Sequence, residues 1–173
     1  MKSMVALSHE FLKPALHPQA VCIDATLGNG KDTRFFLEHK VGHVYGFEIQ
    51  KEIFERTVKD LDPRKFTGMR MSHESIDQIH QADAIVFNFG YCPGADPDIT
   101  TLAKTSVTAV EKAIKILRRK GRMALVFYPH PQGVEESRAI EAVLVKYTDT
   151  CSMIRIEQIG KESPYMIGIE KNR

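Results

Sequence analysis

The chain has 173 residues and is 43% hydrophobic, so it can bury one sizeable core, and we expect a single domain over residues 1–173. The 24 Lys and Arg against 22 Asp and Glu give a net charge of +2, which leaves room only for a local basic patch as a nucleic-acid contact. The 3 cysteines are widely spaced and contain no CxxC pair, which argues against a disulfide framework and against a zinc site.

The opening stretch, MKSMVALSHEFLKPALHP, has no long apolar core and is not expected to be a signal peptide. No apolar run in the chain approaches the ~18 residues that a membrane-spanning helix needs. We therefore expect a soluble, cytoplasmic protein without a membrane partner.

Apolar, strand-like runs alternate with segments of helical period along most of the chain. The predicted strands are VCIDA (21–25), HVYGFE (43–48), GMRM (68–71), AIVFNFG (84–90) and RMALVFY (122–128). The predicted helix faces are marked by side chains at helical spacing: Ile53, Phe54, Thr57, Val58 and Leu61; Val107, Val110, Ile114 and Leu117; and Ile140, Val143, Leu144 and Tyr147. This alternation predicts a parallel sheet that is covered by helices on both faces.

The C-terminal part of the chain follows another pattern. SMIRIEQI (152–159) and PYMIGIE (164–170) have the character of strands and are joined by the short link GKES, with no helix between them. A hairpin-like connection of this kind would place antiparallel strands at one edge of the sheet. We therefore predict an α/β fold with a mostly parallel, seven-stranded sheet and an antiparallel edge.

The segment DATLGNGKDT (24–33) lies between the first predicted strand and a helix-like segment. A Walker-type phosphate loop needs Lys-Ser/Thr after its final glycine, whereas Gly30 is followed by Lys31 and Asp32. The dinucleotide fingerprint needs a third glycine, and position 33 is a threonine. Asp24 would also repel a pyrophosphate, so a ligand that carries an amine or a positive charge fits this loop better.

Glu48 ends the second predicted strand, 20 residues after Gly28, a spacing that suits an acid that hydrogen-bonds ribose hydroxyls. A ribose and an ammonium group without a diphosphate describe S-adenosylmethionine (SAM). The sequence therefore predicts a SAM site built from the loop and Glu48. The alternative is that Gly28 and Gly30 only turn the chain, and that Asp24 and Glu48 are solvated acids at strand ends.

A second constellation, NFGYCPGAD (88–96), ends the fourth predicted strand, where ligands gather in open α/β sheets. Asn88 offers a side-chain carbonyl that can accept a hydrogen bond from an attacking amine, and Tyr91 can stack on a planar group. The segment is similar to the (Asp/Asn)-Pro-Pro-Tyr signature of amino-methyltransferases, with Phe-Gly in place of Pro-Pro. The alternative is a polar strand terminus with Tyr91 packed in the core.

Together, DATLGNGKDT, FNFGYCPGADPDITT, YPHPQGVEE and SPYMIGIEK resemble a family of small bacterial proteins named rRNA methylases. The resemblance runs nearly end to end and includes the early LSHEFL helix. Members of this family act as the tRNA methyltransferase that converts 5-aminomethyl-2-thiouridine at the wobble position to its methylaminomethyl form. The resemblance implies a Rossmann-like class I methyltransferase, SAM as cofactor with S-adenosylhomocysteine as product, and the tRNA anticodon loop as substrate. A homodimer is left open as the assembly.

The resemblance also implies residue roles. The cofactor would be bound by Asp24, Thr26, Gly28, Asn29, Gly30, Asp32, Thr33, Glu48, Ile49, His73, Asn88 and Gly90. The catalytic residues would be Asn88, Tyr91, Asp96 and His130. Two departures stand out: Ala95 replaces a second glycine, and YPHPQG is one residue shorter than the usual Tyr-x-Gly-His-Pro-x-Gly, which shifts the expected placement of His130.

The chemistry fits these roles. Methyl transfer from a sulfonium needs in-line positioning of the acceptor, and an amine attacks only as the free base. Asn88 can orient the amine, and Tyr91, Asp96 and His130 are the candidates for a polar relay. No metal is expected to take part.

KILRRKGR (115–122), expected to close the helix before the fifth strand, carries five basic side chains. Arg118, Arg119 or Arg122 could contact RNA phosphates, and Tyr91 could stack on an anticodon base turned out of its loop. The helix dipole and solubility are an equally good reason for such residues. Beside the tRNA enzyme, two alternatives stay open: a SAM- or nucleoside-binding protein without transfer activity, and a methyltransferase acting on rRNA or a small-molecule amine.

Overall fold

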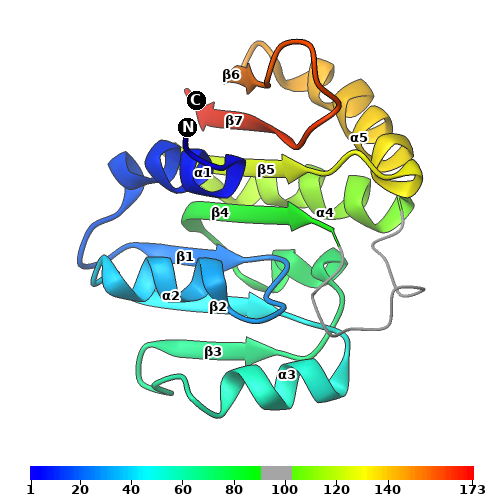
Figure 1. Ribbon diagram of the computed structural model, residues 1–173. Coiled ribbons are helices and arrows are strands. Elements are labelled where there is room, and N and C mark those ends of the chain that lie inside the picture. The colour runs from blue at the N-terminus through cyan, green and yellow to red at the C-terminus, as the bar shows by residue number, and fades with distance from the viewer. Residues whose placement is uncertain (91–102) are drawn as a thin grey trace.

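The computed structural model describes residues 1–90 and 103–173, which form a seven-stranded sheet with helices packed around it (Figure 1). The strands are β1 (Val21–Asp24), β2 (His43–Phe47), β3 (Phe66–Met69), β4 (Ala82–Phe89), β5 (Leu117–Phe127), β6 (Cys151–Ile156) and β7 (Tyr165–Lys171). The α-helices are α1 (Met4–Leu12), α2 (Lys31–Glu38), α3 (Lys51–Val58), α4 (Ala103–Ile116) and α5 (Pro131–Leu144). Short 3₁₀ helices are η1 (Lys13–Ala15), η2 (His73–Gln78) and η3 (Val145–Tyr147).

The strand order is β3-β2-β1-β4-β5-β7-β6. β1 pairs in parallel with both β2 and β4, and the parallel ladder continues to β3 on one side and β5 on the other. β7 is antiparallel to β5 and to β6, as the short link between the last two strands predicts. The expected mostly parallel sheet with an antiparallel edge is confirmed. The order reverses between β1 and β4, which creates a switch point where ligands bind in sheets of this type.

β4 shows why the sheet is covered on both faces. Its side chains alternate, so that Ile85, Phe87 and Phe89 belong to one hydrophobic cluster, whereas Ala84 and Val86 belong to another on the opposite face. Residues of α4, α5 and η2 close the first cluster, and residues of α1 and α2 close the second, with α3 packed against it. A central parallel strand that is buried on both faces is apolar throughout, which explains the uninterrupted run in this segment.

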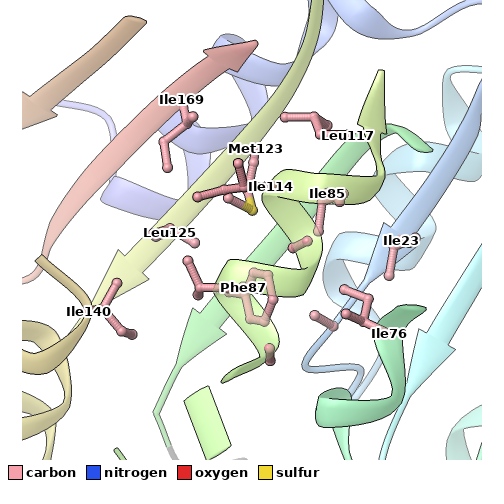
Figure 2. Close-up of a cluster of buried hydrophobic side chains, with 14 of the residues drawn as sticks. Ile23, Ile76, Ile85, Phe87, Ile114, Leu117, Met123, Leu125, Ile140 and Ile169 are labelled. Atoms are coloured by element: carbon pink, nitrogen blue, oxygen red, sulfur yellow. The ribbon is translucent and has the colours of Figure 1, made fainter. Parts of the chain in front are cut away.

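Figure 2 shows the first cluster, in which Ile23, Phe87 and Leu125 of three strands pack beneath the helices. Ile114 of α4 and Ile140 of α5 meet them from the helix side. All five side chains are at most 2% exposed. This layer holds the carboxyl ends of the parallel strands in fixed positions, and the polar residues discussed below are attached to those ends.

The prediction that residues 115–122 close a helix is wrong. α4 ends at Ile116, and Leu117 already pairs with Ala82 in the sheet, whereas Arg122 pairs with Ala84. The residues between these two partners form a wide bulge, in which Lys120 has a φ of 66°. A buried leucine serves a helix and a strand equally well, so its spacing could not locate this boundary.

Lys40, which follows the C-cap residue His39 of α2, is the second non-glycine residue with positive φ among the described residues, at 53°. A residue in this left-handed conformation ends many helices, and glycine is the usual choice because it has no Cβ.

Among the helices of the described ranges, none combines the length and the apolar character that crossing a bilayer requires.

Candidate functional site

The carboxyl ends of β1, β2, β4 and β5 lie at one edge of the sheet, on either side of the switch point (Figure 1). Most of the described residues that the sequence predicts to bind or react follow these strand ends. The site can therefore be built from the loop after β1, the residues after β2, and the ends of β4 and β5.

Asp24, the last residue of β1, is fully buried and organises the loop that follows. Its Oδ2 atom accepts hydrogen bonds from the Thr33 backbone N–H at 3.0 Å and hydroxyl at 2.8 Å, and its Oδ1 atom accepts one from the Thr26 N–H at 3.3 Å. Burial and the nearby Asp32 carboxylate raise the pKa of Asp24 to about 8, against the opposing effect of these hydrogen bonds. The acid thus ties the two ends of the loop together, and a direct contact with SAM stays a prediction.

Two glycines give the loop its shape. Gly28 and Gly30 have φ values of 49° and 79°, in the left-handed region that favours glycine. A Cβ at Gly30 would lie 2.9 Å from the Thr57 Cγ2 atom, so α3 leaves no room for a side chain there. Thr57 also donates a hydrogen bond to the Gly28 carbonyl at 2.6 Å. The loop is therefore held by the next helix as well as by its own strand.

Glu48 lies directly after β2 and reaches the loop, and its predicted contact with the ribose of SAM stays a prediction. Its Oε2 atom accepts a hydrogen bond from the Gly28 N–H at 3.1 Å, and its Oε1 atom accepts one from the Gln50 N–H at 2.9 Å. The structure thus brings Glu48 and Gly28 together. Ile49, the neighbouring predicted adenosine contact, is 58% exposed, which is unusual for a large apolar side chain.

Asn29, at the tip of the loop, is exposed and bound from the helix side. Its Oδ1 atom accepts a hydrogen bond from Arg56 at 2.9 Å, and its backbone carbonyl accepts one from Arg34. The side-chain oxygen of Asn29 is therefore partly committed to α3, and its predicted contact with the cofactor is untested.

Asp32 lies in the first turn of α2 and is buried beneath α1 rather than open to solvent. Its Oδ1 atom is 2.6 Å from the Nε2 atom of His9, and the His9 ring stacks on Phe35 with 3.9 Å between ring centres. His9 belongs to the LSHEFL segment, but nothing in its local pattern indicates a partner 23 residues away. This contact fixes α1 over the start of α2.

Thr26 connects the loop to β4, because its hydroxyl oxygen accepts a hydrogen bond from the Asn88 backbone N–H at 2.8 Å. The Asn88 side chain is hydrogen bonded to Tyr128, the first residue after β5. Burial raises the pKa of the Tyr128 hydroxyl, and the bond from Asn88 opposes this effect. A Cβ at Gly90 would lie 3.2 Å from the Tyr128 ring, so Gly90 lets that ring pack close.

Tyr128 was not singled out from the sequence, although it opens the segment YPHPQGVEE. Its place in the sequence is the signal that could have indicated it: an aromatic hydroxyl follows directly after a strand next to the switch point. Its contacts with Asn88 and Gly90 place it in the same site as the predicted acceptor residues.

His73, at the start of η2, lies beneath the end of β1. It is 7% exposed, its ring centre is 5.7 Å from that of Phe87 and 6.4 Å from that of Phe89, and its side chain is hydrogen bonded to the Ala25 backbone. Burial lowers the pKa of His73. It therefore packs as a neutral ring against the ends of β1 and β4. Its predicted contact with the cofactor stays a prediction.

The whole chain can now be compared with known proteins. Residues 44–170 match the model of the family described as "Putative rRNA methylase". The chain belongs to this family. The resemblance inferred from the sequence motifs is confirmed, as is the Rossmann-like class of the fold.

Two solved structures are similar to this chain over its whole length. One, a "putative rRNA-methylase" from Clostridium thermocellum, is 29% identical with a TM-score of 0.91, covering 99% of this chain and 98% of that one. The other, a "putative methyltransferase" from Streptococcus mutans in complex with SAH, is 28% identical with a TM-score of 0.87, covering 99% of each chain.

A relative from Arabidopsis thaliana is named a chloroplastic tRNA (mnm(5)s(2)U34)-methyltransferase. It is 31% identical to this chain over an alignment of 160 residues, and the match covers 82% of this chain and 58% of the plant protein. The chain therefore spans less than two thirds of the length of that relative.

His130 caps α5, and its hydrogen bond to the helix indicates which ring nitrogen carries the proton. Its Nδ1 atom accepts a hydrogen bond from the Gly133 N–H at 3.0 Å, so the neutral ring carries its proton on Nε2. That Nε2 atom is buried, and residues 1–90 and 103–173 offer it no hydrogen-bond partner. In this tautomer Nε2 can donate a hydrogen bond but cannot take up a proton, so a role in the predicted relay would be that of a donor.

Two variants separate the cap from the donor. His130→Asn keeps a side-chain oxygen at the N-cap, so we expect near-normal stability with a slower methyl transfer, because the Nε2 donor is gone. His130→Ala loses both and should also be less stable by about 1 kcal/mol. Urea unfolding and transfer rates check this; a fully active His130→Asn variant would show that Nε2 has no part in the reaction.

The remaining predicted residues fall into two groups. Tyr91 and Asp96 lie outside the described residues. Arg118 and Arg122 lie toward the amino end of β5, away from the site, and form ion pairs with Asp83 at 2.9 Å and Glu170 at 2.8 Å. The site lies at the carboxyl ends of the parallel strands, whereas these two arginines lie near the amino end of β5. An RNA contact through them would therefore lie outside the site.

Proposed function

We propose that the protein is a SAM-dependent methyltransferase that N-methylates the 5-aminomethyl group of (2-thio)uridine at the wobble position of tRNA. The observation that carries this proposal is the hydrogen bond between Glu48 and the Gly28 loop at the switch point of the sheet. The pair formed by Asn88 and Tyr128 lies at the neighbouring strand ends. Membership of the methylase family and the names of the plant and streptococcal relatives support it.

The described loop residues fit SAM better than a nucleotide phosphate. The first turn of α2 carries the acid Asp32, and Asp24, which is buried with its pKa raised to about 8, adds no positive group, so a diphosphate would find no cation at these two positions. A carboxylate has about four lone-pair positions, and the two backbone bonds of Glu48 leave acceptors for ribose hydroxyls. Gly28, Gly30 and Glu48 would hold the nucleoside, and Asp24 would keep the loop in shape.

When bound, SAM supplies an electrophilic methyl group on its sulfonium. The protein must then hold the acceptor amine in line with that methyl group, as a free base. An Asn88 side chain whose amide nitrogen faces the Tyr128 hydroxyl would keep its carbonyl oxygen free to accept an amine N–H, which would aim the nitrogen lone pair. Transfer would form the new C–N bond as the C–S bond breaks, S-adenosylhomocysteine would leave as the thioether, and the ammonium product would release its proton to solvent water.

The test is methyl transfer to defined acceptors. The protein is incubated with methyl-labelled SAM and, separately, with tRNA that carries 5-aminomethyl-2-thiouridine, with rRNA and with small amines. We expect label only in the tRNA, and nucleoside mass spectrometry should find the methylaminomethyl form. Bound SAM without transfer to any acceptor would instead identify a binding protein, and label in rRNA alone would replace the tRNA assignment.

We expect transfer to survive treatment with EDTA. Within residues 1–90 and 103–173, no three His, Cys, Asp or Glu side chains are grouped so that they could hold a metal ion. Activity is measured after removal of EDTA by gel filtration, with an untreated sample as control. A loss of activity that zinc or magnesium restores would contradict this expectation.

A further inference from the structure

Two arginines from different helices converge on the tip of the loop after β1. The Arg34 guanidinium of α2 donates a hydrogen bond to the Asn29 backbone carbonyl, and Arg56 of α3 donates one to the Asn29 Oδ1 atom at 2.9 Å. A Cβ at Gly30 would lie 2.9 Å from both the Arg34 Nη1 atom and the Thr57 Cγ2 atom, so Arg34 reaches across to α3. The two positive charges are therefore held close together, at one residue of the loop.

Acids do not neutralise these two charges directly. Arg34 and Arg56 are exposed, and within the described ranges neither forms an ion pair. Each has an acid four residues away on its own helix, at a spacing that often gives ion pairs; these acids are Glu38 and Glu52. Both guanidiniums turn to the loop tip instead. Like charges that are held together in this way favour an anion beside them.

The surface around the loop tip carries a net positive charge. Lys31 is exposed and lies three residues before Arg34, on the same face of α2. Over residues 31–40 and 51–60, which hold α2 and α3, the exposed charged side chains are six cations and four acids, a net charge of +2. The further acid of these segments, Asp32, is buried and bound to His9. Cations still exceed acids when Asp32 is counted, so this surface attracts a polyanion.

We infer that the loop-tip cluster, which consists of Lys31, Arg34 and Arg56, binds the sugar–phosphate backbone of the substrate RNA; the inference rests on the proposed function. Because β1 neighbours β4, the loop tip lies at the same edge of the sheet as Asn88 (Figure 1). Asn29 occupies only part of the donors of each guanidinium, a planar group that suits phosphate oxygens. Such phosphate contacts orient a substrate without reading its sequence.

The test removes each arginine charge while keeping a hydrogen-bond donor for Asn29, in the variants Arg34→Gln and Arg56→Gln. Arg119→Gln is the matched control. Arg119 is also exposed, forms no ion pair in the part of the chain that the structure describes, and donates to the Asn172 carbonyl at 3.3 Å, but it lies near the amino end of β5. Affinity for an anticodon stem-loop that carries 5-aminomethyl-2-thiouridine is measured over a range of salt concentrations, and SAM affinity is measured on the same samples.

We expect Arg34→Gln and Arg56→Gln each to bind the stem-loop about fivefold more weakly at about 0.1 M salt, with a salt slope smaller by roughly 0.7, because one phosphate contact is lost. The difference from the wild type should vanish toward roughly 1 M salt, since it arises from counterion release. The affinity for SAM should stay unchanged, and Arg119→Gln should bind the RNA as the wild type does.

The inference is overturned if the two variants bind the RNA as the Arg119→Gln control does, or if the wild type binds no RNA. A loss of SAM affinity with an unchanged salt slope would also overturn it, because the arginines would then only brace the cofactor loop. Methyl transfer by the wild type is recorded separately. If it labels tRNA while both variants bind RNA normally, the surface assignment fails and the proposed function stands. If the variants lose RNA affinity as expected but the wild type labels no RNA, the proposed function fails instead.

Discussion

Asn88→Ala is expected to lower the rate of methyl transfer about a hundredfold while leaving the affinity for SAM unchanged. Without the side-chain carbonyl, nothing aims the amine lone pair at the methyl group, and a misplacement of about 1 Å is enough for a loss of this size. The backbone of Asn88 keeps its bond to Thr26, so β4 and the loop should stay in place. Single-turnover rates and calorimetric SAM binding measure the two effects.

Tyr128→Phe is the matched variant for this prediction. The ring that packs against Gly90 remains, and only the hydroxyl that is bonded to Asn88 is lost. We expect a rate between those of the wild type and Asn88→Ala, because the amide is present but less firmly oriented. If Asn88→Ala methylates tRNA at the wild-type rate, the positioning role of this pair is wrong.

Glu48→Gln is expected to weaken SAM binding by about 1–3 kcal/mol, because a charge-assisted hydrogen bond to the ribose is lost. The structure adds a second cost. The glutamine amide group would face the N–H of either Gly28 or Gln50, each of which now donates to a carboxylate oxygen. Calorimetry on the folded variant measures the sum of both effects.

Glu52→Gln provides the control. Glu52 is an exposed acid in the first turn of α3, and its substitution removes the same charge four residues after Glu48. It should bind SAM as the wild type does. Unchanged SAM affinity in Glu48→Gln, with a normal unfolding curve, would mean that Glu48 serves only to hold the loop and that the ribose is bound elsewhere.

The sequence was sufficient for the sheet and for the parts of the site that follow directly from it. Buried parallel strands are short apolar runs, and the carboxyl ends of such strands share one edge, so Glu48 and the Gly28 loop could be assigned to one site. The hydrogen bond between them was not predicted. The start of β5 could not, because Leu117 continues the helical spacing of Ile114 while it packs in the sheet. Leu117 fits both the helical spacing and a buried strand position, and tertiary packing decides for the strand.

The contacts that join distant segments also escaped prediction. The bond between Asn88 and Tyr128 depends on β4 and β5 being neighbours in register, and the pair of His9 with Asp32 depends on where α1 crosses the sheet. Neither pair is marked by spacing or composition. The tautomer of His130 likewise follows from a backbone N–H that only the folded helix end supplies.

The two lysines with positive φ have a consequence for protein engineering. Lys40 ends α2 at the terminus remote from the loop, and Lys120 lies in the bulge at the amino end of β5. Glycine adopts this backbone conformation without the steric cost that a Cβ incurs, and the exposed ion pair of Lys120 with Glu170 contributes little in return. Both positions therefore offer gains in thermal tolerance that leave the catalytic edge of the molecule untouched.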